Sequence, residues 1–516
     1  MSEGRFLLGV DVGTYGSKGV VVNQAGRVLA TSFAEHGVDS PRLGWYEHDP
    51  ERVWWNDLTR IIQELLDRSG IDPREVAALG VSGLSPEVTA VDAEGRVLRP
   101  AILYSDTRAA AESERIIEKL GEQRILDVGG NALSVQSAGP KVLWLRDHEP
   151  EVFGRTRYIY DAPSYLTYLL TGVSRMDYGQ ACWFHPLFNI RDLKWDESVC
   201  TELGISSSIF PPLGWATEVA GGISRSAAQA TGLVEGTPVI TGTGDGPAEQ
   251  VAVGASEEGE AALVYGSTMC LLALSNTPRV HARAAAAIGA VPGRRLLMTY
   301  MNASAALTRW FRDNFGQVER EAEASLGINA YQLLSAEAAQ VPPGSEGLVV
   351  LPYFAGEGHP ILDTSARGLI LGLTLSHKRG HLYRALLEGV AYGLRHNLET
   401  FQEAGLPIRR YLAVGGGTKS KLWTQIVSDV VGINQELVSV PFGAPFADAY
   451  LAGYGVGMFR DMRTLRDEWA QISGRVSHQP ELWPVYDRYY QVYRALYEPL
   501  KKHMHTLAEL SMAARD

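Results

Sequence analysis

Near its middle, the 516-residue chain reads Thr241-Gly242-Thr243-Gly244-Asp245-Gly246-Pro247. The apolar run Pro238–Ile240 precedes this stretch, and small residues follow it at 248–255. The order predicts a strand, a tight glycine turn and a helix, with the Asp245 carboxylate exposed at the strand end. Such a carboxylate can accept a proton from a substrate hydroxyl or hold a metal ion through water. The alternative is an aspartate that only caps the following helix.

The bulk composition bounds the possible functions. The length predicts two or more domains, and the content of 45% apolar and 21% charged residues is typical of a globular protein. The net charge of −12 argues against non-specific nucleic-acid binding, so no nucleic-acid partner is expected.

The cysteines and the chain start bear on localisation. The cysteines Cys182, Cys200 and Cys270 are far apart and predict neither a disulfide framework nor a metal site. We expect no signal peptide, and no apolar run approaches the ~18 residues that a membrane span needs. These features predict a cytoplasmic protein with no membrane partner.

Three glycine-containing turns follow predicted strands. The first lies between apolar runs and holds Asp11, Gly13, Thr14 and Lys18. Backbone N–H groups, hydroxyls and an ammonium can together surround phosphate oxygens, although this turn is not a Walker loop. An ordinary polar hairpin is the alternative. The other two turns are Gly266-Ser267-Thr268 and Gly415-Gly416-Gly417, the latter followed by Lys419 and a predicted helix at Lys421–Val431.

The first two turns form a weak internal repeat and could grip one polyphosphate from both sides. The third has the strand, glycine and helix order of a nucleotide-binding segment.

Further polar candidates follow the strand expected at residues 77–81. Ser85, Pro86 and Glu87 lie in the next loop, and Asp106 and Arg108 stand two apart at a later strand exit. Two residues with that spacing can point the same way into a cleft, whereas the alternative is a local salt bridge or helix cap. For residues 171–185 we expect a solvated connection rather than a pocket lining.

Two further helices are expected late in the chain. Small residues predict a helix at Ala444–Gly455, and a tyrosine-rich stripe that starts at Tyr486 predicts a C-terminal helix. We interpret the stripe as a core contact and not as a ligand site.

The order of these segments resembles that of the FGGY carbohydrate kinases over roughly residues 5–500, with the xylulokinases as the most similar subgroup. The motifs that carry the resemblance are Gly9-x-Asp11-x-Gly13-Thr14-x-x-x-Lys18, Gly44-Trp45-x-Glu47-x-Asp49-Pro50-x-x-x-Trp54-Trp55, Asp106-x-Arg108-Ala109, Gly244-Asp245-Gly246, Gly266-Ser267-Thr268, Ala355-Gly356-Glu357, Gly372-Leu373-Thr374-Leu375-x-His377, and Gly415-Gly416-Gly417-x-Lys419-Ser420-x-x-Trp423.

The resemblance implies an α/β fold of two actin-like (ribonuclease-H-like) domains, 1–256 on the sugar side and 257–516 on the ATP side, with a cleft between them. It implies ATP and Mg²⁺ as cofactors, a sugar or polyol as substrate, and a possible homodimer. Carried over residue by residue, Asp245 is the general base, and Asp11 and Asp245 are the metal residues. The ATP-side residues are Asp11, Gly13, Thr14, Lys18, Gly266, Ser267, Thr268, Gly415, Gly416, Gly417 and Lys419, and the sugar-side residues are Ser85, Pro86, Glu87, Asp106, Arg108, Asp245 and Gly246.

Two departures from the xylulokinase pattern concern the substrate. Xylulokinases commonly carry Met-His where this chain has Ser85-Pro86, and Asn or Gln commonly follows the catalytic aspartate, whereas Gly246 stands here. Both positions are expected to touch sugar hydroxyls, so the lost side chains put D-xylulose in question, and Glu87 is a candidate replacement acceptor.

Two readings of function therefore stay open beside a D-xylulose kinase. One is a kinase for another ketose or polyol, such as ribulose or ribitol. The other, from a different class, is an actin-like ATPase without a sugar substrate; a sugar-binding regulator is less supported, because no DNA-binding helix pair or basic patch is visible.

Overall fold

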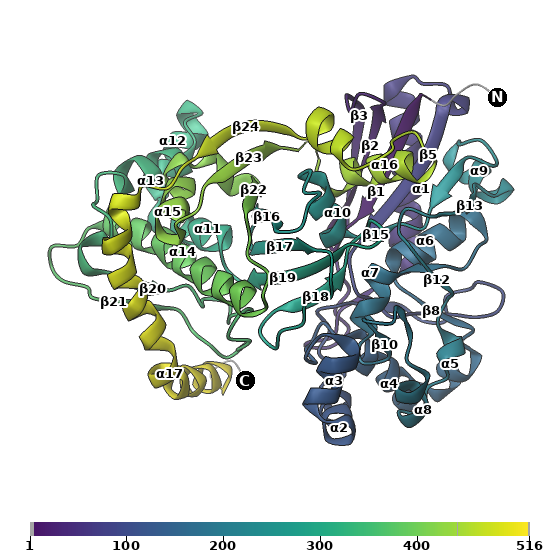
Figure 1. Cartoon of the computed structure of the whole chain (residues 1–516), viewed down its shortest axis with the longest axis horizontal. Helices are drawn as coiled ribbons and strands as arrows, with labels where there is room; N and C mark the ends of the chain where they lie inside the picture. Colours follow the sequence, from purple (N-terminus) through teal and green to yellow (C-terminus); the bar gives the residue numbers. More distant parts are fainter. Residues whose placement is uncertain (1–4, 441, 514–516) are drawn as a thin grey trace. The chain divides into compact units, whose positions relative to one another are not determined.

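A computed structural model describes residues 5–440 and 442–513 of the chain, which forms two compact units (Figure 1). The first unit comprises Met1–Glu258, Leu274–Leu296 and Val440–Gln471. The second comprises Gly259–Ala273, Leu297–Ser439 and Ile472–Asp516. The predicted family domains, 1–256 and 257–516, stay a prediction; by packing, two segments from the second half of the sequence join the first unit.

The first unit is built on a mixed sheet with the order β13-β14-β5-β1-β2-β3, and β15 also pairs with β5. The expected opening meander is confirmed, because β1 pairs antiparallel with β2 and β2 with β3. The strands are β1 (Phe6–Val12), β2 (Gly16–Asn23), β3 (Val28–Glu35), β5 (Val76–Gly83), β13 (Val219–Gly222), β14 (Pro238–Ile240) and β15 (Thr243–Gly244).

Alternate residues of β1 face opposite sides of this sheet, as strand geometry requires. Leu8 and Val10 lie in a core with α1 (Asn56–Ser69) and α6 (Ala162–Thr171), whereas Leu7 packs with α10 (Asp245–Ala252) and α16 (Ala444–Gly455). Two glycines allow α16 to approach the sheet: a Cβ at Gly9 would collide with the Pro445 carbonyl oxygen, and one at Gly80 with that of Asp448. Figure 1 shows α16 beside the purple strands of the chain start.

Helices and short strands complete the first unit. They include β4 (Glu47–His48), β6 (Thr89–Val91), β7 (Ala101–Ile102), α2 (Ala110–Leu120), α3 (Glu122–Gly129), α4 (Ala138–His148), α5 (Pro150–Arg155), β8 (Tyr158–Tyr160), β9 (Met176–Asp177), α7 (Tyr178–Ala181), β10 (Phe188–Asn189), β11 (Lys194–Trp195), α8 (Glu197–Glu202), β12 (Leu213–Gly214), α9 (Arg225–Thr231) and β18 (Ala285–Ile288).

The expectation of a solvated connection at residues 171–185 is wrong, because Asp177, Gln180, Phe184 and His185 are buried there. The local sequence is polar, but its polar groups bond to the protein interior instead of to water: Asp177 caps α7 and Gln180 accepts from Ser85.

The second unit has a sheet that includes the order β19-β17-β16-β22-β23-β24. Its long helix is α14 (Arg379–Glu403), and the buried Tyr486, Tyr490 and Tyr493 confirm the expected core stripe. Its other elements are β16 (Glu260–Tyr265), β17 (Met269–Ser275), β19 (Arg295–Met301), α11 (Ala305–Phe315), α12 (Gln317–Leu326), α13 (Ala330–Ala338), β20 (Val349–Leu351), β21 (Leu369–Leu371), β22 (Arg410–Val414), α15 (Lys421–Val431), β23 (Gln435–Ser439), β24 (Gln471–Val476) and α17 (Trp483–Ala513).

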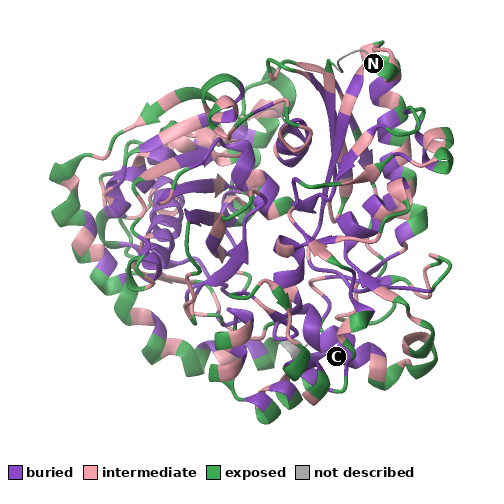
Figure 2. Cartoon of the chain, turned by 45° about the vertical axis from the view of Figure 1, so that its right-hand side comes forward, coloured by how far each residue is buried: buried purple, intermediate pink, exposed green. Residues whose placement is uncertain are grey.

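The central strands of both sheets are largely buried, and the exposed residues gather on helices and loops (Figure 2). Among the described residues, no helix has both the length and the apolar character needed to cross a bilayer.

Candidate active site

Three parallel strands of the first unit end at one edge of its sheet. Asp11 on β1 is in register with Ser82 on β5, and Gly244 on β15 is in register with Gly83. The residues that follow these strands therefore leave the sheet together, at the edge where ligands bind in α/β sheets. The first phosphate turn, the loop at 84–87 and Asp245 are brought together in this way.

Asp245 is the first residue of α10, and its side chain is exposed to water. The N-cap of α10 is Gly244, so the alternative that Asp245 is the helix cap does not hold; its Oδ1 accepts a short bond from the Gly246 N–H, at 2.7 Å. Protein atoms nevertheless crowd the carboxylate. Partial desolvation, followed by the negative charges of Asp11 and Glu249, raises the pKa of Asp245 to about 8.

The first phosphate turn joins β1 to β2, and its Asp11 and Lys18 lie directly opposite each other in the hairpin register. Lys18 Nζ is 3.4 Å from Asp11 Oδ2. Burial by itself lowers the pKa of Lys18, but the carboxylates of Asp11, Glu249 and Asp245 outweigh it, so the pKa of Lys18 is raised. One ammonium thus lies among several carboxylates, beside a turn whose Thr14 hydroxyl is 3.4 Å from the Tyr104 hydroxyl.

Asp448, on α16, is a member of this cluster that the sequence analysis missed. Ser82 Oγ lies 2.9 Å from Asp11 Oδ1 and 2.6 Å from Asp448 Oδ2. A hydroxyl carries a single proton, so when Ser82 donates to Asp11 the second contact needs a proton on Asp448. This agrees with the pKa of Asp448, which burial and then the charge of Asp11 raise well above its ordinary value.

Two sequence signals could have found the missed acids. Glu249 follows Asp245 by four residues and so lies on the same face of the predicted helix. Asp448 is a lone charged residue in a helix of otherwise small and apolar residues, which is an expensive position for a carboxyl without a partner.

The loop after β5 places the sugar-side candidates next to buried polar groups. Ser85 Oγ donates to Gln180 Oε1 at 2.6 Å, and Pro86 is buried. Glu87 is fully buried; its Oε2 accepts from the Ala162 N–H at 3.3 Å, while its Oε1 has no partner among the described residues. Burial, followed by the charge of Asp161, raises the pKa of Glu87 well above its ordinary value, which favours a neutral carboxyl.

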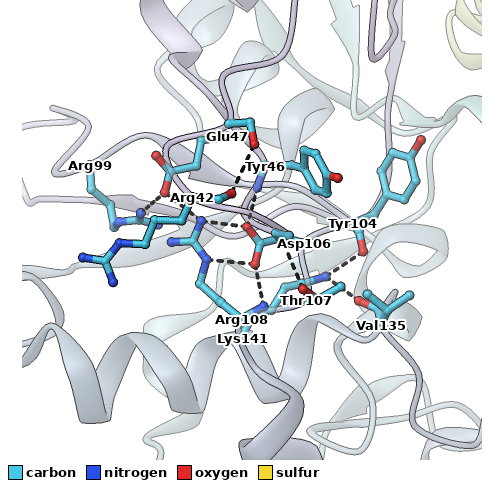
Figure 3. Close-up of polar contacts among 12 residues, drawn as sticks. Arg42, Tyr46, Glu47, Arg99, Tyr104, Asp106, Thr107, Arg108, Val135 and Lys141 are labelled. Carbon is cyan, nitrogen blue, oxygen red and sulfur yellow. Dashed lines mark hydrogen bonds and ion pairs between the residues drawn. The ribbon is translucent and has the colours of Figure 1, made fainter. Parts of the chain in front are cut away.

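Asp106 and Arg108 form a buried ion-pair network, drawn in Figure 3. Arg108 donates from Nε to Asp106 Oδ1 at 2.8 Å and from an amino group to Asp106 Oδ2 at 2.7 Å, and the same amino group is 2.8 Å from Glu47 Oε1. Asp106 also accepts from the Tyr46 N–H at 2.6 Å. Both Asp106 oxygens are therefore bound by the chain itself, and the role of this pair in the sugar site stays a prediction.

Lys141 lies beside the same network. It is buried, and its Nζ donates to the carbonyls of Tyr104 at 2.8 Å and Val135 at 2.7 Å. Burial lowers the pKa of Lys141 to about 7, with Asp106 and Glu87 acting in the opposite direction. Lys141 thus ties the Tyr104 segment to the start of α4.

The second unit carries the other two glycine turns at neighbouring strand ends. β16 and β22 are parallel, with Val264 in register with Val414, so the turns at 266–268 and 415–417 leave one sheet edge side by side. Ser267 and Thr268 are exposed, and the carbonyls of Gly266 and Ser267 accept N–H groups from the start of α11. Gly415 has φ of +104° next to the Tyr265 carbonyl, a conformation that favours glycine. Lys419 is exposed at the end of this turn.

Glu357, from the Ala355-Gly356-Glu357 motif, gives a test of stability against pH. It is buried; its Oε1 accepts from the N–H groups of Asn302 and Gly358, and burial raises its pKa to about 8. A raised pKa in the folded state means that its stabilisation is complete below the ordinary pKa of 4.5 and is lost as the pH rises towards 8.

We expect Glu357→Gln to remove this dependence, because an amide can keep the same acceptor oxygen without the charge. Denaturant unfolding from pH 5 to pH 8 is expected to show the wild type losing roughly 1 kcal/mol per pH unit relative to the variant. Parallel stability curves for the two proteins would contradict the assignment.

The acidic cluster of the first unit fits Mg²⁺ in its donor chemistry. Asp11 and Asp245 offer carboxylate oxygens, the ligands that Mg²⁺ prefers. The negative charge of Asp11 contributes to the raised pKa of Asp245, which indicates that the two carboxylates are near each other. Within the described part of the chain, no three His, Cys, Asp or Glu side chains are arranged to hold a metal ion. A bound Mg²⁺ would therefore take most of its ligands from water and phosphate, as it usually does.

Comparison with known proteins matches most of the chain to the two domains of one protein family. Residues 6–252 match the N-terminal domain, and residues 261–453 the C-terminal domain, of the FGGY family of carbohydrate kinases. Xylulose kinase of Bacillus subtilis (strain 168) is 27% identical over 504 residues, which cover 96% of this chain and 97% of that protein. Glycerol kinase of Symbiobacterium thermophilum is 30% identical over 501 residues, covering 92% of this chain and 94% of that protein.

Solved structures agree with this match. The crystal structure of xylulose kinase from Rhodospirillum rubrum aligns with a TM-score of 0.89 at 30% identity, over 97% of this chain and 100% of that one.

Proposed function

The chain belongs to the FGGY family of carbohydrate kinases, and from that premise we propose that it transfers the γ-phosphate of ATP to a hydroxyl of a ketopentose, with D-xylulose the first candidate. Family kinases use ATP as the phosphate donor. The observation that carries the proposal is the exposed Asp245 carboxylate at the strand edge where Asp11 and Lys18 also lie.

In this proposal Asp245 orients the sugar hydroxyl and accepts its proton as the new O–P bond forms. Its raised pKa makes it a stronger base than an ordinary aspartate. Lys18, with the N–H groups and the Thr14 hydroxyl of the first turn, binds phosphate oxygens and stabilises the charge that develops on them. Ser267, Thr268 and the glycines of the second unit are the remaining proposed contacts to the nucleotide. Mg²⁺, held by Asp11 and Asp245, would neutralise phosphate charge.

The substrate is left open by Ser85, Pro86 and Gly246 in the first unit, because these residues depart from the xylulokinase pattern. Relatives of comparable identity carry the names xylulose kinase and glycerol kinase, so a related ketose or a polyol such as ribulose or ribitol is the second candidate. Glu87 has a buried carboxyl oxygen without a partner in the described structure, which makes it the candidate partner for one substrate hydroxyl.

A coupled assay of ADP release tests the proposed function directly. The wild type would be measured with D-xylulose, D-ribulose, ribitol and glycerol, and without an acceptor. We expect one acceptor to stimulate turnover strongly. Turnover that does not depend on an acceptor would instead support the actin-like ATPase alternative. A cytoplasmic location and a homodimer stay predictions from the sequence.

Glu87 gives a sharper test of the sugar site. A neutral carboxyl and an amide each present one acceptor and a donor, so Glu87→Gln is expected to keep the KM for the sugar within a few-fold. Glu87→Leu leaves a substrate hydroxyl without a partner and is expected to raise that KM about 10- to 100-fold, with the KM for ATP unchanged. An unaltered sugar KM in the leucine variant would remove Glu87 from the substrate site.

A further inference from the structure

His36, in the loop after β3, holds the first phosphate turn at two points. Its ring Nε2 is 3.0 Å from the Gly13 carbonyl oxygen, and its backbone N–H donates to the Tyr15 carbonyl at 3.1 Å. The turn also has an internal bond, from the Gly13 N–H to the Gly16 carbonyl at 3.1 Å. Residue 36 therefore fixes the conformation of the segment whose N–H groups are proposed to face phosphate.

The other side of the His36 ring is tied to α1. Nδ1 is 2.8 Å from Asp57 Oδ2, and the same oxygen accepts from Ser17 Oγ at 2.9 Å. The His36 and Asp57 side chains are 9% and 7% exposed, so water competes little for these contacts. A chain of hydrogen bonds thus runs from Gly13 through His36 to Asp57, and Ser17 bonds to the same Asp57. It ties both ends of the turn to α1.

The contacts of His36 define its charge. A carbonyl oxygen and a carboxylate oxygen both accept, so both contacts are hydrogen bonds when both ring nitrogens donate, as they do in an imidazolium paired with Asp57. The nearest other titratable ring, His48 on β4, lies 5.2 Å away and accepts the Trp54 indole N–H on Nδ1. Burial lowers the pKa of His48 to about 4, which leaves it neutral at pH 7. Asp57 is then the counter-charge that faces His36.

We propose that His36 is a positioning residue for the phosphate tail of ATP, acting through the Gly13 carbonyl and with Asp57 as its brace. The inference rests on the proposed function, because it assumes that the turn at 13–18 binds phosphate. A ring with a proton on only one nitrogen directs a lone pair either at the Gly13 carbonyl or at the Asp57 carboxylate, and the hydrogen bond to that group is lost. Nucleotide affinity is therefore expected to fall when the brace is removed.

Asp57→Asn is the variant that separates charge from position. An asparagine Nδ2 at the position of Oδ2 can donate to both His36 Nδ1 and Ser17 Oγ, so a His36 ring with its proton on Nε2 keeps the bond to Gly13. The variant is expected to bind nucleotide within a few-fold of the wild type. His36→Ala removes the brace and is expected to weaken nucleotide binding about 10- to 100-fold, as loss of a charged hydrogen-bonded group does, with the KM for the sugar unchanged.

The experiment is calorimetric titration with ADP at pH 7, alongside kinetics, on the full chain and these two variants. His148→Ala is the matched control, since His148 also pairs with a carboxylate, Glu112, but away from the turn. Nitrogen-15 NMR of the histidine rings is expected to show His36 with both nitrogens protonated at pH 7.

Each outcome decides a separate point. A wild type that binds no nucleotide refutes the proposed function itself. If the wild type binds nucleotide but His36→Ala binds it equally well, or if Asp57→Asn binds it as weakly as His36→Ala, the positioning role is refuted alone. Should His36→Ala fail to fold, His36→Phe, which keeps a ring but has no donors, is measured in its place, and wild-type nucleotide affinity in that variant refutes the role.

Discussion

Asp245→Asn is expected to fold normally and to lose nearly all sugar-dependent turnover. The asparagine side chain keeps the shape and can still accept the Gly246 N–H, but it cannot take a proton from the substrate hydroxyl. General-base groups contribute about 10²- to 10⁴-fold to rates, so kcat is expected to fall by at least that factor while the KM values change little. Circular dichroism and a coupled ADP-release assay would be run on the same preparation.

The control for this variant is Asp192→Asn. Asp192 is an exposed surface aspartate that pairs with Lys194 at 3.4 Å, and its loss is expected to leave kcat unchanged. A well-folded Asp245→Asn protein that retains wild-type turnover would refute the general-base role. Loss of activity in both variants would point to an effect on folding instead.

Arg108→Ala is expected to have the largest effect on stability. The Arg108 side chain is wholly buried, contacts Asp106 and Glu47, and lies over the Trp45 ring at 3.9 Å. Its removal leaves two buried carboxylates without this cation, which typically costs about 3–5 kcal/mol. Chemical denaturation followed by tryptophan fluorescence would measure the free energy of unfolding.

Arg42→Ala is the matched control for Arg108. Arg42 lies over the same Trp45 ring at 4.7 Å but is exposed, so its loss is expected to cost less than about 1 kcal/mol. The pair of variants also tests the sugar-side role that the family resemblance implies for Arg108. If Arg108→Ala kept its stability and raised only the KM for the sugar, Arg108 would be a substrate contact and not a structural one.

Local patterns predicted most of the first unit's sheet and its site. Apolar runs broken by glycine turns identified β1, β2 and β5, and the Thr241–Pro247 stretch placed Asp245 after a strand and at the start of a helix. The predicted family resemblance and the α/β fold are confirmed by the matches to both FGGY domains and to the xylulose kinase structure. These features could be predicted because strand, turn and helix signals are read from neighbouring residues.

The polar segment at residues 171–185 shows the limit of such reading. Its composition indicated solvent exposure, yet Asp177 and Gln180 are buried and bond to Thr243 and Ser85. Their partners lie tens of residues away in sequence. Whether a polar side chain faces water or a distant polar partner depends on packing, which a local pattern does not contain.

The sequence by itself therefore determined the family, the strands and helices around the glycine turns, and the central aspartate, because each is encoded by residues close together along the chain. Only the tertiary structure decided that Asp106 and Arg108 bind each other, that His36 braces the first turn, and that Asp448 joins Asp11. The Ser82–Asp448 contact spans 366 residues of sequence. It exists because glycines at positions 9 and 80 let α16 pack against the first sheet. This packing joins distant segments and cannot be predicted from any one of them.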